Sequence, residues 1–175
     1  FQTLFFELLK IHNENIQSLK LPTSILNVLV ADNDESIEYV YGEEALFKFF
    51  CSKHFEFEEK KKKYSNKSID VIMKEVFFSR LRTELTNSLA LIKDILEYID
   101  SNKEINNRNK VQFYRHVFNT QLSEYQSFWF CVIFVSIATS EELKKFKKLK
   151  IHNKFRIIKI NKEITEYLYS RIENS

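Results

Sequence analysis

The stretch FWFCVIFVSIA, residues 128–138, is the longest apolar run of the sequence. It is well short of the roughly 20 residues that a membrane-spanning helix needs, so we expect it to lie inside a folded domain. With the residues before it, the run predicts one long helix over 111–138, apolar on all sides in its second half and therefore buried. A buried strand over 128–137 is the alternative, since Val, Ile, Phe and Trp favour strands, but no glycine-marked hairpin adjoins it.

The chain holds a single Gly and a single Pro in 175 residues. Sandwiches and barrels need many turn residues with special backbone angles, so an architecture rich in strands is excluded. Phosphate-cradling loops also need several glycines, which excludes the usual nucleotide-binding folds and leaves no cofactor to expect. The length fits one domain over 1–175, and the hydrophobic content of 44% supplies enough material for its core.

Apolar residues recur at helical spacing through most of the chain. Beside the central run, we expect helices over residues 1–19, 43–63, 69–99, 140–150 and 163–172, joined by polar connectors. The sequence therefore predicts an all-α protein, an irregular multi-helix bundle around a long apolar central helix.

The net charge of +3 is mild, and only one local charge imbalance is strong. Its cations are Lys144, Lys145, Lys147, Lys148, Lys150, Lys154 and Arg156. Phosphate or lipid headgroups suit such a segment, whereas a solvent-facing amphipathic helix explains the same residues without a ligand. The tract 58–63, two acidic residues before four basic ones, is typical of a solvated helix end.

Cysteine and histidine spacing gives no sign of a metal site. Cys51 and Cys131 lie far apart beside aromatic residues, which favours buried thiols in a reducing compartment over a disulfide framework. The four histidines are never three or four residues from one another, so no zinc site is expected.

Residues 108–116, RNKVQFYRH, resemble the Arg–His motif of HEPN-type helical ribonucleases, in which both side chains act on the scissile phosphate. The fit is imperfect, because Arg108 precedes His116 by one residue more than that motif allows and Arg115 adjoins His116 directly. The pair is therefore either a weak catalytic candidate or part of a polar helix face.

Several segments taken in order resemble a bacterial family, the phage abortive infection proteins. They are FQTLFFELLKIHNENIQSL (1–19), GEEALFKFF (42–50), SLALIKDILEYID (88–100), FNTQLSEYQSFWFCVIF (118–134) and KIHNKFRIIKI (150–160). The best single match is formed by Gln121, Leu122, Ser123 and Tyr125, which resemble the family's Q-L-S-x-Y-E. A second match, to I-L-K-Y-I-D, is formed by Ile95, Leu96, Tyr98, Ile99 and Asp100.

The chain also departs from the family pattern. Residues 87–90 read NSLA where the family carries H-Y-F-R, a Lys becomes Glu97, and the Arg ahead of Q-L-S becomes Asn119. If those polar residues carry an activity in the relatives, this chain lacks it or performs it differently.

The resemblance implies a role in anti-phage defence that ends in growth arrest or death of the infected cell. The leading hypothesis is an effector or sensor domain that acts through contacts with a protein partner or a phage-derived trigger, with homo-oligomers allowed. An RNA-cleaving toxin that uses the Arg–His pair is the enzyme alternative. A regulatory module that senses a phage protein through residues 121–125 is a third, and the competing interpretation of Gln121 and Ser123 is that they are buried and form hydrogen bonds between helices.

The first residue is Phe1 rather than Met, so we expect a fragment or processed product of a longer chain. Relatives in the family often carry hydrophobic N-terminal segments ahead of this domain. We therefore expect a cytoplasmic location, or one at the inner face of the bacterial membrane if such a segment tethers the full-length protein.

Overall fold

A computed structural model describes residues 1–26, 38–79, 81, 83–105, 107–147 and 161–174. Helices make up 83% of them, which confirms the all-α class. The elements are α1 (Gln2–Ser18), β1 (Lys20–Pro22), β2 (Tyr39–Tyr41), α2 (Gly42–Lys63), α3 (Ile69–Met73), α4 (Thr83–Ser101), α5 (Arg108–Gln121), α6 (Glu124–Ile137), α7 (Ser140–Lys147) and α8 (Lys162–Glu173). Short 3-10 turns at Thr23–Ile25 and Lys103–Ile105 and a π-helical turn at Lys74–Phe78 complete this set.

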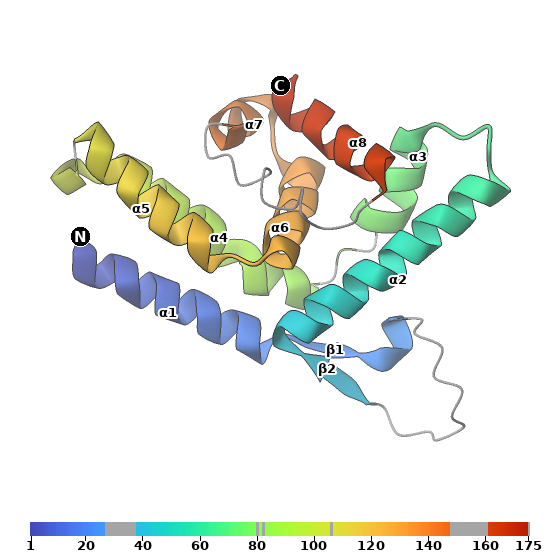
Figure 1. Cartoon of the computed structure of the whole chain (residues 1–175), viewed down its shortest axis with the longest axis horizontal. Helices are drawn as coiled ribbons and strands as arrows, with labels where there is room; N and C mark the ends of the chain where they lie inside the picture. Colours follow the sequence, from blue (N-terminus) through green and yellow to red (C-terminus); the bar gives the residue numbers. More distant parts are fainter. Residues whose placement is uncertain (27–37, 80, 82, 106, 148–160, 175) are drawn as a thin grey trace.

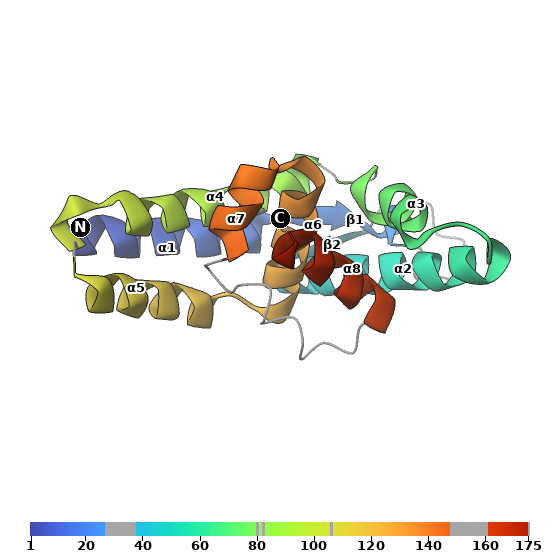
Figure 2. The same cartoon turned by 90° about the horizontal axis from the view of Figure 1, so that it is seen from above.

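The helices form an elongated molecule. Helices α1, α4 and α5 run side by side as one arm, and α2 extends in the other direction (Figures 1 and 2). Helix α6 stands where the two parts meet and packs against α2, α4 and α8. No helix of the described ranges is both long and apolar enough to cross a bilayer.

Helix α6 is buried on every side. Ten consecutive residues, 126–135, are buried, as the all-round apolar pattern predicts. The Trp129 ring stacks on Phe49 at 4.7 Å between ring centroids, and its indole nitrogen donates to the Leu46 carbonyl at 3.1 Å. Phe128 meets Phe50 and Phe77 edge-on, so α6 is tied to both α2 and the π-helical turn.

The prediction of one long central helix over 111–138 is wrong. The chain breaks at Leu122 and Ser123, whose extended backbones separate α5 from α6. The Ser123 hydroxyl accepts a hydrogen bond from the Gln126 amide at 3.0 Å, so Ser123 is the N-cap of a new helix. The sequence S-E-Y-Q has the spacing of a capping box and contains the signal for this break.

The single helix expected over 69–99 is also divided. It becomes α3, the π-helical turn and α4, and the Ser79 amide closes the π turn on the Lys74 carbonyl at 2.9 Å. The turn places Phe77 fully inside the core, where its ring contacts those of Phe57 and Phe128.

A short antiparallel pair, β1 with β2, was not predicted. Leu21 pairs with Val40, and both side chains are buried under the start of α2. Gly42 then begins α2 with φ of +56°, a backbone angle at which an L side chain is strained, so the lone glycine lies where the chain turns from strand into helix.

A chain of hydrogen bonds joins α1, α6 and α2. His12 Nε2 lies 2.9 Å from Gln126 Oε1, and the Gln126 side-chain nitrogen donates to Glu43 Oε1. Because a carboxylate only accepts, Gln126 must donate to Glu43 and present its oxygen to His12, which makes His12 the Nε2–H tautomer. The other ring nitrogen, Nδ1, is then a bare acceptor, and it is buried without a partner.

This environment holds His12 neutral. The ring is fully buried, and desolvation lowers its pKa although the bonds to Gln126 and the charge of Glu43 oppose the shift. Protonation would also create an N–H group at the buried Nδ1, which has no hydrogen-bond acceptor beside it.

The burial of α6 predicts a large penalty for shortening Phe128 to Ala. Phe128→Ala removes a fully buried ring, and we expect the free energy of unfolding to fall by about 3 to 5 kcal/mol because a cavity remains. Urea denaturation followed by circular dichroism measures this change. Phe113→Ala, at a ring that is 58% exposed, is the matched control and should change stability by roughly 0.5 kcal/mol or less.

The lowered pKa of His12 predicts a pH-dependent stability. Below the ordinary pKa of 6.5 the unfolded chain binds a proton that folded His12 does not, so the free energy of unfolding should fall as pH falls. The loss should continue down to the lowered pKa of the folded state, with a slope of up to about 1.4 kcal/mol per pH unit.

Urea denaturation of the wild type and of His12→Gln at a series of pH values from about 7.5 to 5 isolates this contribution, because all other titrating groups are common to both. We expect the variant to be less stable at neutral pH and to show a shallower dependence. Equal slopes in the two proteins would contradict the account of His12.

Candidate functional site

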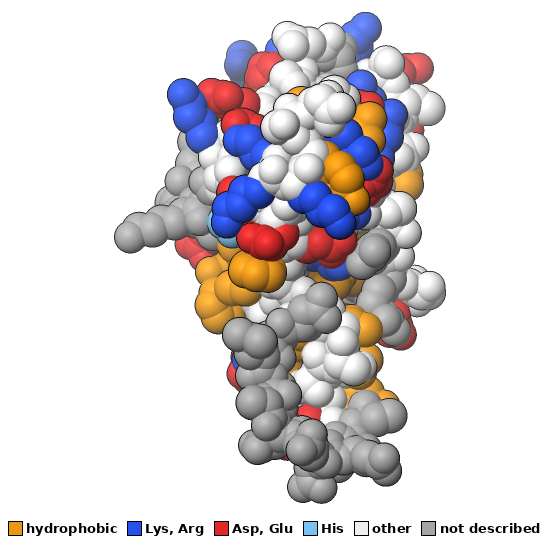
Figure 3. Space-filling model, turned by 90° about the vertical axis from the view of Figure 1, so that its right-hand side faces the viewer, with side chains coloured by type: hydrophobic (Ala, Val, Ile, Leu, Met, Phe, Trp, Pro, Cys, Tyr) orange, Lys and Arg blue, Asp and Glu red, His pale blue; other side chains and the backbone are white. Residues whose placement is uncertain are grey.

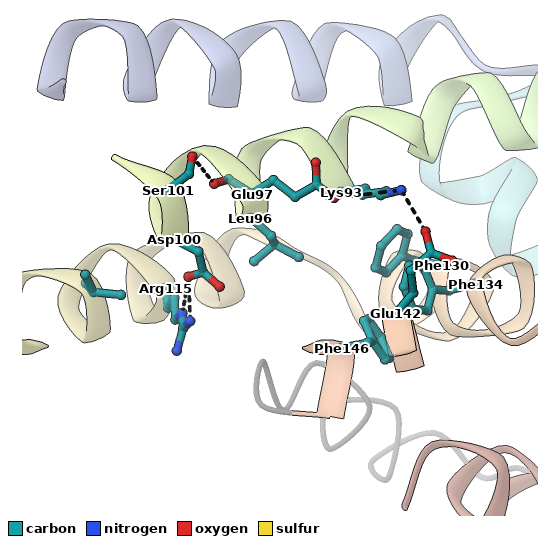
Figure 4. Close-up of a pocket in the computed structure, with 11 residues that line it drawn as sticks. Lys93, Leu96, Glu97, Asp100, Ser101, Arg115, Phe130, Phe134, Glu142 and Phe146 are labelled. Carbon is teal, nitrogen blue, oxygen red and sulfur yellow. Dashed lines mark hydrogen bonds and ion pairs between the residues drawn. The ribbon is translucent and has the colours of Figure 1, made fainter. Parts of the chain in front are cut away.

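A cavity of about 590 Å³ opens between α4, α5, α6 and α7. Its size lies within the range typical of ligand pockets. The lining residues are Lys93, Leu96, Glu97, Asp100, Ser101, Val111, Arg115, Phe130, Phe134, Glu142 and Phe146, and we call this the α4–α7 pocket (Figure 4).

The floor of the α4–α7 pocket is apolar and aromatic. Phe134 stacks on Phe146 at 4.5 Å between ring centroids, and Phe130 lies within 6 Å of both rings. Leu96 points into the space between α4 and α5 (Figure 4), and Val111 lines the same space from α5. The chemistry of this floor matches an apolar or aromatic group, which gains free energy on leaving water.

The rim is charged, and its cations are held by carboxylates. Arg115 donates through Nε to Asp100 Oδ1 at 2.8 Å, and Lys93 lies 3.3 Å from Glu142 Oε1 and 3.8 Å from Glu97 Oε1. Three carboxylates face two cations, so the rim carries a formal excess of one negative charge. These pairs are partly exposed, so their main effect is to fix the rim in position rather than to stabilise the fold.

Glu142 is fixed by a capping box at the start of α7. Its Oε2 accepts from the Thr139 amide and hydroxyl, each at 2.9 Å, and the Thr139 hydroxyl accepts from the Glu142 amide. The two Thr139 bonds, followed by the Lys93 bond, lower the pKa of Glu142. The carboxylate is therefore ionised at neutral pH and available to Lys93.

The polar groups of the pocket lining are engaged with one another or with the backbone. Its one hydroxyl, on Ser101, donates to the Glu97 carbonyl at 2.7 Å, and neither histidine nor cysteine is among the lining residues. A hydroxyl nucleophile needs a base within hydrogen-bond reach, and Ser101 bonds to a backbone carbonyl rather than to one of the three carboxylates of the lining.

The ribonuclease candidates are distributed over different sides of α5. Arg115 is engaged with Asp100 at the pocket rim, whereas Arg108 and His116 are exposed. Neighbouring helix positions point about 100° apart, so Arg115 and His116 diverge. Arg108 and Arg115, two turns apart, share a face, but His116 does not join them there.

The basic segment expected to bind phosphate lies mostly beyond the described residues. Lys148, Lys150, Lys154 and Arg156 fall outside them, as does the side chain of Lys145. Lys144 is exposed at α7, and Lys147 pairs with Glu173 at 2.8 Å, which ties α7 to α8.

The lysines near the end of α2 are also matched by acids. Lys60 pairs with Glu75 at 3.3 Å, and Lys61 pairs with Glu163 of α8. Figure 3 shows acidic and basic side chains intermingled on that side of the molecule. The described surface there is mixed in charge, which agrees with the prediction of a solvated helix end over residues 58–63.

The family-like residues 121–125 hold the junction of α5, α6 and α2. Leu122 is buried, and Ser123 both caps α6 and donates to Glu43 at 2.8 Å. Tyr125 packs on Phe47 and Phe50. Gln121 differs from the others, because it is exposed and lines a second groove between α1 and α5.

The cysteine prediction is half right. Cys131 is fully buried in α6, and burial raises its pKa well above its usual value. Cys51 is exposed, because position 51 lies on the outward face of α2. Within the described part of the chain, no three His, Cys, Asp or Glu side chains are grouped to hold a metal ion.

Sequence reasoning missed most of the pocket. Lys93, Glu142 and Phe146 come from helices that are far apart along the chain, and periodicity cannot show that they meet. A partial signal was present in two places: the T-x-x-E spacing at 139–142 marks a capping box, and the family-like segment 88–100 contains Leu96, Glu97 and Asp100.

No protein-family model, curated protein or solved structure matches the chain. The likeness to the abortive infection family therefore rests on the segments quoted above.

Proposed function

We propose that this chain is an anti-phage defence domain, an effector or sensor of abortive infection that acts by binding a protein in the α4–α7 pocket. The observation that carries the proposal is the pocket itself: an aromatic floor within a rim of paired charges, whose one hydroxyl bonds to a backbone carbonyl rather than to a base. Recognition through an apolar anchor fits that surface better than catalysis.

The family-like segments support the same site. Leu96 and Asp100 belong to the I-L-x-Y-I-D-like segment, and Phe130 and Phe134 belong to the segment that follows Q-L-S. Two family-like segments thus line one cavity. We include in the proposal a phage-derived protein as the trigger and a site of action in the cytoplasm or at the inner face of the membrane.

A ribonuclease is the competing function, and the geometry gives it less support. Its histidine would have to act with an arginine on the same phosphate, whereas Arg115 is held by Asp100 and His116 lies on another side of α5. The two functions separate experimentally, because only the ribonuclease depends on His116.

The proposal predicts that filling the pocket abolishes defence. Val111→Trp adds a large ring at a half-buried position of the lining without removing a core side chain, and it should weaken partner binding by about tenfold or more. The measurement is phage plating on bacteria that carry the full-length gene, with wild type and variant expressed at equal levels. The wild type should reduce plaque numbers and Val111→Trp should restore them.

Two matched variants make this test specific. Gln112→Trp places the same ring on the exposed side of α5, and His116→Ala removes the ribonuclease candidate, and both should protect like the wild type. Equal plating with and without the wild-type gene would overturn the defence role. Loss of protection in His116→Ala, together with RNA cleavage by the wild type only, would replace it with the enzyme.

A further inference from the structure

Helix α2 carries an outward face with exposed side chains that no other described helix or strand covers. Its buried side chains include Ala45, Leu46, Phe49 and Phe57, all on the side that meets α6 and the π-helical turn. On the opposite side six positions recur at spacings of four and three residues, which places them along one seam of the helix. They are Glu44, Lys48, Cys51, Phe55, Glu58 and Lys62, and we call them the α2 seam.

The centre of the α2 seam is apolar and open to solvent. Phe55 is 65% exposed, the exposed Cys51 lies one turn before it, and Phe47 at 43% exposure flanks them. Hydrophobic side chains are visible among charged ones in Figure 3, on the side of the molecule at the outer end of α2. A solvent-facing helix of a monomer does not need a large ring at such a position.

The two ends of the seam carry charges in a self-complementary order. Along the chain the seam runs acid, base, Cys, Phe, acid, base. When a second α2 is laid antiparallel and centred on position 53, Glu44 faces the partner's Lys62 and Lys48 faces the partner's Glu58. Opposite charges then face each other at both ends of the seam. A parallel, in-register pairing would instead set like charges against each other.

The same alignment also matches the apolar centre in size. Each Phe55 faces the partner's Cys51, so a large ring lies against a small side chain on both sides of the two-fold axis. This is how knobs fill holes between packed helices. Charge order and side-chain size thus select the same orientation and the same register.

Three of the four charged side chains of the seam have their partners within α2, so contacts with a second helix cost them little. Glu44 pairs with Lys48 at 2.9 Å within its own helix, and Lys62 pairs with Glu59 at 3.1 Å. Such exposed pairs contribute little, so they can be shared with a partner helix. Glu58 already accepts a hydrogen bond from the Asn161 side chain, which holds its carboxylate in place.

We infer that a second copy of this chain binds along the α2 seam, forming an antiparallel homodimer in which α2 packs on α2. The α2 seam shares no residue with the α4–α7 pocket, so the inference does not rest on the proposed function. A single helix face buries area at the low end of the interface range, so the dimer should dissociate reversibly on dilution.

Charge reversal tests both the occupant and the register. Glu44→Lys and Lys62→Glu should each raise the dimer dissociation constant by about tenfold or more, because each variant sets two like-charged contacts in the symmetric dimer. The double variant Glu44→Lys with Lys62→Glu restores opposite signs and should return to within about threefold of the wild type. Sedimentation equilibrium over a concentration series measures all four constants.

Two further variants serve as controls for folding and for the specificity of the charge effects. Phe55→Ser should leave a monomer with unchanged helical circular dichroism, since the ring is mostly exposed. Reversal of the exposed α1 pair, Lys10→Glu with Glu14→Lys, should leave the dimer unchanged. A wild type that stays monomeric at its highest soluble concentration, or a double variant that dimerises no better than the two single variants, would overturn the inference.

Discussion

The structure depends on the burial of α6 from all sides. A 14-residue helix without a polar face spans about 21 Å, and every turn of it must be covered by another element. Helix α2 covers it through Phe49 and Phe50, the π-helical turn through Phe77, and α7 through Phe146. The bundle is irregular because its helices are arranged around a short central helix rather than along a long one.

The break at Leu122 and Ser123 changes the direction of the chain between α5 and α6, and the pocket depends on this change. If α5 and α6 were one continuous helix, α5 could not run back along α4 while α6 crosses towards α2 (Figure 1). The α4–α7 pocket lies in the angle that the break creates, with α6 and α7 supplying the aromatic floor. Ser123 is thus structural as a helix cap, and its position determines where a ligand could bind.

Charged groups on this protein are placed mainly to hold elements together. The Glu43 carboxylate accepts from both Gln126 and Ser123, and the Glu142 carboxylate joins a capping box to the pocket rim. At the far end of α2 the lysines meet acids of the π-helical turn and of α8. A chain with 29% charged residues therefore shows little single-sign surface among its described residues.

The sequence by itself determined the helical class, the ends of α1, the extent of α2 and α8, and the burial of residues near Trp129. These follow from periodicity and from the scarcity of Gly and Pro, which act within one helix. It also contained the signal for the break before α6, the S-x-x-Q spacing at 123–126, and it marked the start of α7 near Ser140.

Only the tertiary structure decided which faces meet. The α4–α7 pocket joins residues from four helices, His12 reaches a glutamine 114 positions away, and Cys51 is exposed while Cys131 is buried, although both adjoin aromatic residues in the sequence. Periodicity shows that a helix has an apolar face but not which helix covers it, because that choice depends on the combined packing of all the helices around α6.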